Sequence, residues 1–165
     1  MHFMTRRLLI LAFVVALTVP AAAQDAEKLY NRQGYIHLQT GFRQHAGGFS
    51  GAGGGGEVFF YRGLGASADA AAQTANNGGG VGLVTYAMGP VWNFTNRTRS
   101  QRIVPFLGAG YVFALENGSA HGGYVAGGFT WWFRSRIGFR FEIRDQVIPA
   151  MGGNQVAFRF GLSFR

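Results

Sequence analysis

The sequence predicts an all-β fold, a closed eight-stranded antiparallel up-and-down transmembrane β-barrel. Composition, a two-residue hydrophobic period and the order of the connections support it. Charged residues make up 13% of the 165-residue chain and apolar residues 48%, with 27 glycines and 15% aromatics. Glycine is a poor helix former and aromatic residues favour strands, so this balance favours β-structure over helices and over disorder.

The hydrophobic period is clearest near the C-terminus. From Ile137 to Arg144, apolar residues alternate with Gly138, Arg140, Glu142 and Arg144. From residue 155 to 164, a second apolar series alternates with small and polar residues, including Arg159. An alternation of two is typical of strands with unlike faces. At about ten residues each, both segments suit tilted membrane strands better than short globular ones.

Six further strands precede these two, with the pattern weakening toward the N-terminus. A short helix over Ser67–Ala75 is the alternative to the third strand and its loop, and alternation favours the strand. We predict strands at Gly34–Phe42, Ala52–Tyr61, Leu64–Ala70, Gly82–Phe94, Ile103–Leu115 and Gly123–Phe133.

The predicted connections alternate between longer and tighter segments, as a membrane barrel with external loops and periplasmic turns requires. Those after the odd strands are rich in Gly, Asn, Ser and Ala: Arg43–Gly51, Ala71–Gly80, Glu116–Gly122 and Pro149–Asn154. Tight links follow the second and sixth strands, whereas Thr95–Arg102 is longer than a turn. An even number of strands places both chain ends on the periplasmic side.

Residues 1–23 have the order of a secretory signal peptide. Arg6 and Arg7 precede an apolar run from Leu8 to Val19, and small residues follow Pro20. The run of twelve residues would rise only about 18 Å as a helix, too little for a hydrocarbon core of about 30 Å. We therefore expect cleavage after Ala23, a mature barrel domain over 24–165 and a location in the bacterial outer membrane.

Six charged residues fall on the predicted inner faces of the strands. An eight-stranded barrel is just filled by its side chains, and a buried charge must be paired. We therefore expect an ion-pair network in the lumen, built from Glu57, Asp69, Arg140, Glu142, Arg144 and Arg159.

Aromatic residues gather where the even strands end, which is one rim of the predicted barrel. Tyr and Trp accumulate at membrane interfaces because their rings are apolar and their edges polar. We expect a periplasmic aromatic rim formed by Tyr61, Trp92, Trp131, Trp132 and Phe164.

The last strand reads Val156-x-Phe158-x-Phe160-x-Leu162-x-Phe164. With this strand, and with Met88-Gly89-Pro90 and Pro105-Phe106-Leu107-Gly108, the chain resembles the small outer-membrane barrels of the OmpA/OmpX type. The resemblance implies that the five alternating residues form the signal read by the outer-membrane assembly machinery. Arg165 departs from the family pattern, which ends on the aromatic residue itself.

The preferred function is a non-catalytic scaffold with a filled lumen. Two alternatives remain, a soluble ligand-binding barrel and an outer-membrane lipid-modifying enzyme. A soluble periplasmic ligand-binding barrel would place its apolar residues inside. Outer-membrane lipid-modifying barrels carry a His-x-Ser pair, but His37, His45 and His121 are followed two places on by Gln39, Gly47 and Gly123. We therefore expect no enzyme activity.

We expect no metal and no cofactor. The glycines of residues 51–56 fit G-x-G-x-x-G, but a strand follows where a phosphate-binding loop needs a helix. The net charge of +8 belongs to an exported chain, so lipid headgroups are better partners for it than nucleic acid. The expected partners are outer-membrane lipids, lipopolysaccharide and the assembly machinery, and the expected state is a monomer.

Overall fold

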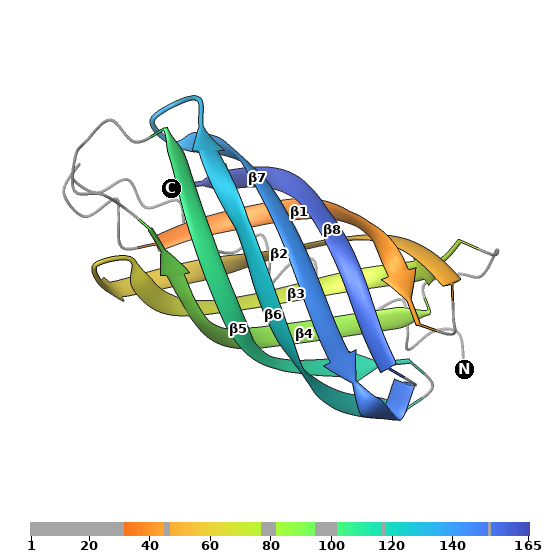
Figure 1. Ribbon diagram of the computed structural model, residues 1–165. Helices are drawn as coiled ribbons and strands as arrows, with labels where there is room; N and C mark the ends of the chain where they lie inside the picture. Colours follow the sequence, from red (N-terminus) through yellow and green to blue (C-terminus); the bar gives the residue numbers. More distant parts are fainter. Residues whose placement is uncertain (1–31, 45–46, 77–81, 95–101, 117, 152) are drawn as a thin grey trace, which may run out of the picture.

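The chain folds into a closed barrel in which every strand pairs antiparallel with its sequence neighbours, and the first strand pairs with the last. Figure 1 shows the strands crossing the barrel at a steep tilt in a computed structural model. The structure describes residues 32–44, 47–76, 82–94, 102–116, 118–151 and 153–165. The predicted signal peptide lies outside these residues. The all-β, eight-stranded, up-and-down architecture is confirmed.

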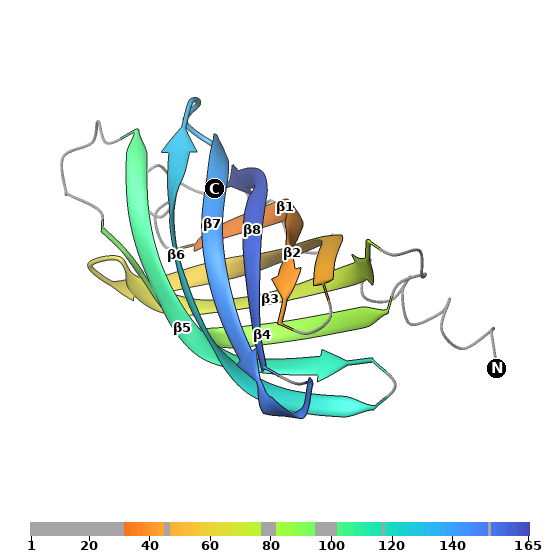
Figure 2. The same cartoon turned by 45° about the vertical axis from the view of Figure 1, so that its right-hand side comes forward.

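The eight strands are long, with 11 to 15 residues each. Figures 1 and 2 show the order of the labelled strands around the barrel. Their bounds are β1 Arg32–Arg43, β2 Gly47–Tyr61, β3 Leu64–Ala75, β4 Leu83–Asn93, β5 Ile103–Leu115, β6 Ser119–Trp132, β7 Ile137–Ile148 and β8 Gly153–Phe164.

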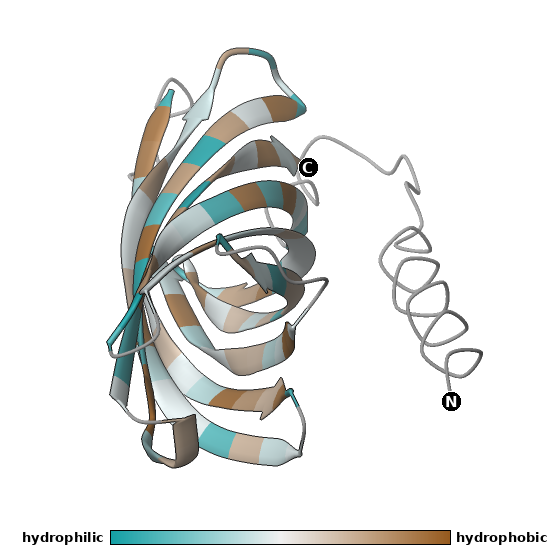
Figure 3. Cartoon of the chain, turned by 90° about the vertical axis from the view of Figure 1, so that its right-hand side faces the viewer, coloured by the Kyte–Doolittle hydropathy of each residue, from teal (hydrophilic) through white to brown (hydrophobic). Residues whose placement is uncertain are grey.

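Inner and outer faces alternate along each strand, as the sequence predicts. In β7, Arg140, Glu142 and Arg144 are buried, and the residues between them face outward. Hydrophilic and hydrophobic bands alternate along the ribbons in Figure 3. No helix among the described residues has the length and hydropathy to cross a membrane.

The four connections predicted as long loops are shorter than predicted, whereas the tight Arg62-Gly63 link is confirmed. Strands β1, β2, β3, β6 and β8 extend into the segments predicted as long loops, so the link from β1 to β2 spans only residues 44–46. The longest link, residues 94–102, joins β4 to β5 at the end that was expected to carry turns. In these segments glycine and alanine lie within paired strands. Their abundance therefore reflects a need for small side chains in the barrel wall and does not mark a loop.

The alanine-rich segment is strand throughout, and β3 continues five residues beyond the predicted end at Ala70. Ala71, Ala72 and Gln73 pair with β2 on one side and with β4 on the other. Pairing on both sides satisfies the backbone hydrogen bonds that a short helix would otherwise supply. Pairing with β2 and β4 therefore holds these alanines in the extended conformation of a strand.

The tightest connection, Arg62-Gly63 between β2 and β3, uses two residues with positive φ, 46° and 83°. A two-residue hairpin of this kind matches the twist of the strands, but it requires the left-handed region at both positions. Glycine adopts that region freely and arginine does not.

Replacing Arg62 by asparagine is therefore expected to stabilise the barrel, by about 0.5 kcal/mol, because Asn-Gly is the preferred sequence for this turn. The measurement is urea unfolding of protein folded into phospholipid vesicles. Arg134→Asn, in the longer β6–β7 connection, is the control and should leave the midpoint unchanged. A lower midpoint for Arg62→Asn would contradict the turn assignment.

We name the two ends of the barrel by their connections. The turn end carries Arg62-Gly63 and both the start of β1 and the end of β8. The loop mouth is the opposite end, where odd strands finish and even strands begin.

Candidate functional site: the charged lumen and the outer wall

The lumen holds all six charged residues that the sequence places there. Glu57, Asp69, Arg140, Glu142, Arg144 and Arg159 come from β2, β3, β7 and β8, and each is between 2% and 7% exposed. Three carboxylates and three guanidinium groups leave the group with zero formal net charge. A buried charge is tolerated only with a partner. The contribution of these six residues to stability therefore depends on how they pair.

Glu142 lies at the centre of the network and contacts all three arginines. Its Oε1 accepts hydrogen bonds from Arg144 Nε at 2.8 Å and Arg159 Nη1 at 3.3 Å. Its Oε2 accepts from Arg140 Nη2 at 3.1 Å. Charge-assisted hydrogen bonds to Arg are the stronger kind, and the contact with Arg159 adds a side-chain link between β7 and β8 to their backbone pairing.

Asp69 joins the network from the opposite wall. Arg144 donates to both of its carboxylate oxygens, Nη2 to Oδ2 at 2.8 Å and Nη1 to Oδ1 at 3.3 Å. Arg159 Nη1 also donates to Oδ1 at 3.3 Å, and the nitrogen is thus shared with Glu142. These contacts connect β3 to β7 and β8 across the lumen.

Arg140 is held by charge and by aromatic rings. Its Nη2 lies 2.8 Å from Glu57 Oε1, and Gln33 donates to the other oxygen of Glu57. The guanidinium lies 3.7 Å from the ring centroid of Phe106 and 4.4 Å from that of Tyr35. Such stacking favours a desolvated cation, so Arg140 is fixed between two strands that it does not pair with.

Glycines stand beside the long polar side chains. Gly161 pairs with Arg140 on β7 and with His37 on β1. A Cβ at Gly161 would lie 1.9 Å from the carbonyl oxygen of Ile36. Small residues next to large ones let the interior of a small barrel fill without overlap, which explains the glycine content of inward positions.

An apolar cluster fills the loop-mouth half of the lumen between β4 and β7. Its position separates the charged centre from the solvent at that end on one side of the barrel. It consists of Leu83, Ala87, Val112, Ala114, Ala120, Tyr124, Ala126 and Ile148.

Trp132 lies at the turn end, at the end of β6. The sequence predicts it as part of the exposed aromatic rim. That assignment differs from the structure, because Trp132 is only 5% exposed and points into the barrel. The guanidinium of Arg165 lies 4.1 Å from its ring, and Arg165 Nε donates to the carbonyl of Ser135. The alternation that turns Trp131 outward necessarily turns its neighbour inward.

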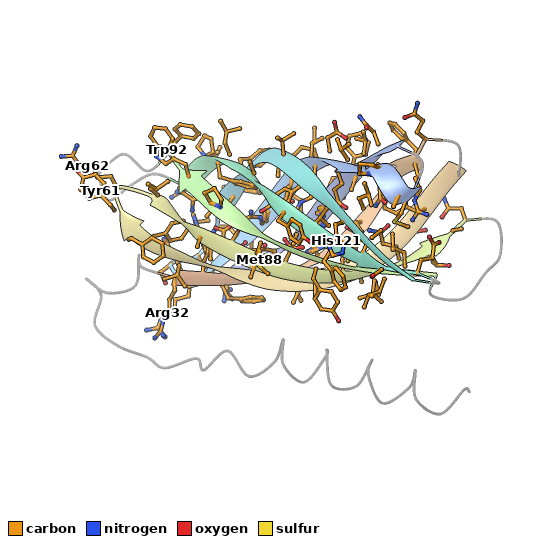
Figure 4. All side chains as sticks on the ribbon, turned by 90° about the horizontal axis from the view of Figure 1, so that it is seen from below. Arg32, Tyr61, Arg62, Met88, Trp92 and His121 are labelled. Carbon is orange, nitrogen blue, oxygen red and sulfur yellow. The ribbon has the colours of Figure 1, made fainter. Side chains whose placement is uncertain are left out.

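The other four rim residues are exposed at the turn end: Tyr61, Trp92, Trp131 and Phe164. Tyr61, Arg62 and Trp92 project from the same end of the barrel in Figure 4, whereas Met88 lies nearer the middle of the wall. Trp92 stacks on Phe94 at 5.0 Å, and Trp131 contacts Phe133 edge-on at 6.2 Å. Trp92 and Trp131 therefore belong to outward-facing aromatic pairs.

The outer wall is apolar over most of its height. Leu38 is 69% exposed, Val125 60% and Met88 59%. Asp145 interrupts this surface on β7, where it faces outward between Val125 and Val156. Its Oδ1 has no hydrogen-bond partner within the part of the chain that the structure describes. Asp145 lies three residues from the loop-mouth end of its strand, so the charge is displaced toward that end.

The two described histidines lie on opposite sides of the barrel wall. His37 is buried in the lumen, and neither ring nitrogen has a hydrogen-bond partner among the described residues. His121 faces outward, and its Nδ1 contacts the hydroxyl of Tyr111. His45 lies outside the described residues. In the described ranges, no three His, Cys, Asp or Glu residues gather closely enough to hold a metal.

Several polar lumen residues were not predicted as part of the network. Arg159 Nε donates to Gln39 Oε1 at 3.0 Å, and Tyr35 lies within 3.4 Å of Asp69. Gln155 donates to Gln73 across the lumen at 2.7 Å. Their inward positions follow from the same alternation, but neutral side chains carry no pairing requirement that would single them out in the sequence.

The five alternating residues of β8 face outward: Val156, Phe158, Phe160, Leu162 and Phe164. Phe160 lies 5.2 Å from Phe141 on the neighbouring strand. Phe164 faces outward while Arg165 folds back over Trp132. The outward face of β8 is thus apolar up to Phe164, and Arg165 does not interrupt it.

The fold is shared with small outer-membrane barrels whose structures are solved. Neisserial surface protein A aligns with a TM-score of 0.60 at 11% identity, over 81% of this chain and 95% of its own. OprG of Pseudomonas aeruginosa aligns with a TM-score of 0.61 at 11% identity, over 81% and 95%. The N-terminal barrel domain of Pseudomonas aeruginosa OprF gives 0.57 at 11%, over 81% and 96%.

These likenesses establish the class of fold, a small eight-stranded barrel of the kind found in outer-membrane proteins. No protein-family model matches the sequence, and no curated protein matches it. Function must therefore be inferred from the wall and the lumen.

Proposed function

We propose that this chain is an integral outer-membrane protein whose barrel serves as a non-catalytic structural scaffold with a filled lumen. The observation that carries the proposal is that polar and apolar side chains are distributed oppositely to those of a soluble protein. Ion pairs lie inside the barrel, and large hydrophobic side chains are exposed outside. Outer-membrane barrels place an apolar band about 25 Å tall toward lipid.

The spacing of outward residues on β6 supports this band. From Trp131 at the turn end to His121 near the loop mouth there are ten residues, and Val125 and Phe129 face outward between them. At about 3.3 Å per residue and a tilt of about 40°, ten residues rise about 25 Å. Trp131 and the Tyr111–His121 pair would then lie at the two membrane interfaces.

The contacts in the lumen favour a plug over a pore. Arg144 and Arg159 connect Asp69 to Glu142 across the interior, which supports a filled lumen at this level. An eight-stranded barrel is just wide enough for its own side chains. A soluble ligand-binding barrel would need an apolar interior, whereas these charges occupy the space of the ligand.

Three measurements on the full chain test the proposal. We expect the protein in the outer-membrane fraction, no steady conductance in planar bilayers, and no change in the acyl chains of lipopolysaccharide by mass spectrometry. Recovery from the periplasm without detergent would refute the membrane location. A steady conductance would refute the filled lumen, and altered acyl chains would refute the non-catalytic role.

We further propose that the outward face of β8 is the signal recognised by the outer-membrane assembly machinery, and that lipids and lipopolysaccharide contact the wall. Phe164→Ala should reduce the folded outer-membrane fraction in cells, because it removes the last aromatic residue of the strand. Deletion of Arg165 should preserve or raise that fraction. If deletion of Arg165 alone abolished assembly, the signal would include the arginine.

A further inference from the structure

A cavity of about 140 Å³ opens at the loop mouth, outside the ion-pair network. It lies where β1 and β3 finish and β2 and β4 begin, on the right of Figure 1. Phe49 and Leu83, both buried, form apolar walls. Its polar lining residues are Arg43, Gln73, Thr74 and Glu116.

Gln73 lines this cavity, and its amide is buried. Gln73 is 2% exposed, and its Oε1 accepts the hydrogen bond from Gln155. Its Nε2 has no partner among the described residues. A buried amide N–H without an acceptor is unfavourable, so a turn of the Gln73 amide toward an acceptor in the cavity would be favoured.

Arg43 supplies a cation in the same cavity. Its Nη1 pairs with Glu116 Oε1 at 3.5 Å, with Arg43 mostly buried and Glu116 half-exposed. A long ion pair with one exposed partner contributes little to stability. Because guanidinium has five N–H donors in a planar fork that matches carboxylate and phosphate, a better placed oxyanion can compete with Glu116.

We propose that the loop-mouth cavity binds a small soluble oxyanion, a carboxylate or a phosphate, through the guanidinium of Arg43 and the amide N–H of Gln73. Phe49 and Leu83 bound the space, so that only a small ion or a terminal group enters it. The site goes beyond the scaffold role, because it uses none of the six residues of the ion-pair network.

The test is the unfolding midpoint of the full barrel in neutral detergent micelles, titrated with sodium phosphate or sodium acetate. Sodium chloride at matched ionic strength corrects for screening. A ligand that binds only the folded state raises the midpoint with concentration. We expect a saturable rise for the unmodified protein with at least one of the two ions.

Variants assign the response to the cavity. Arg43→Gln should weaken binding by about tenfold, because it removes the charged fork. Glu116→Gln should tighten binding, since it removes the competing carboxylate. Arg134→Gln, at the turn end, is the matched control and should bind as the unmodified protein does.

The opposite signs expected for Arg43→Gln and Glu116→Gln keep the test decisive if one variant folds poorly. The absence of saturation, or equal responses with and without Arg43, would overturn the proposal. So would weaker binding in Glu116→Gln. Full stabilisation by lipopolysaccharide bilayers without added ion would assign the site to a lipid phosphate and overturn the soluble ligand.

Discussion

Glu142→Gln is expected to lower the free energy of unfolding by about 3–5 kcal/mol, the range for breaking a buried ion pair by removing one partner. The carboxylate of Glu142 accepts hydrogen bonds from Arg140, Arg144 and Arg159. Glutamine keeps the volume but removes the charge, which leaves the lumen with one uncompensated positive charge. Its amide N–H group also adds donors where only acceptors are useful.

Reversible urea unfolding in phospholipid vesicles measures the loss. Glu57→Gln is the matched control, because Glu57 pairs with one guanidinium, that of Arg140, and should therefore lose less. Equal losses in the two variants would show that burial alone matters. A loss below about 1 kcal/mol for Glu142→Gln, the scale of an exposed pair, would contradict the network as the main lumen contact.

Leu38→Arg is expected to destabilise the barrel by about 2–4 kcal/mol in a bilayer, the measured scale for arginine on the lipid face near the midplane. Leu38 lies in the middle of β1, faces outward and is 69% exposed. Since so little of its side chain packs against the protein, the loss would come from the environment outside the wall. On a surface facing water, the same change would be close to neutral.

Ile103→Arg provides the control at the rim. Ile103 is the first residue of β5 at the turn end and is 53% exposed. The penalty for arginine falls to about 0–1 kcal/mol near the interfaces, so this variant should unfold close to the unmodified protein. Equal and small effects for both variants would refute a lipid-facing wall.

In the proposed membrane orientation, His121 and Tyr111 near the loop mouth and Trp92 and Trp131 at the turn end would delimit the apolar band from opposite sides. This makes the two arginine substitutions a test of depth as well as of facing. A third outward position, Asp145, is already charged, and its place toward the loop mouth is consistent with a lower penalty there.

The strand pattern could be read from the sequence where the two faces differ strongly. In β7, charges at Arg140, Glu142 and Arg144 alternate with large apolar residues, and the predicted facing is confirmed. In β2 and β3 the contrast fades, because glycine and alanine occupy both faces. There the predicted ends were wrong by up to five residues, and only pairing with the neighbouring strands sets the ends.

The sequence by itself determined the class of fold and the inward side of each clear strand, because a period of two commits every second residue to the same face. Only the tertiary structure decided which charges meet. Asp69 and Arg144 are 75 positions apart, and their pairing depends on barrel closure, stagger and side-chain reach across the lumen. The cavity between Arg43 and Gln73 likewise exists only where separate strands end together, which no local pattern encodes.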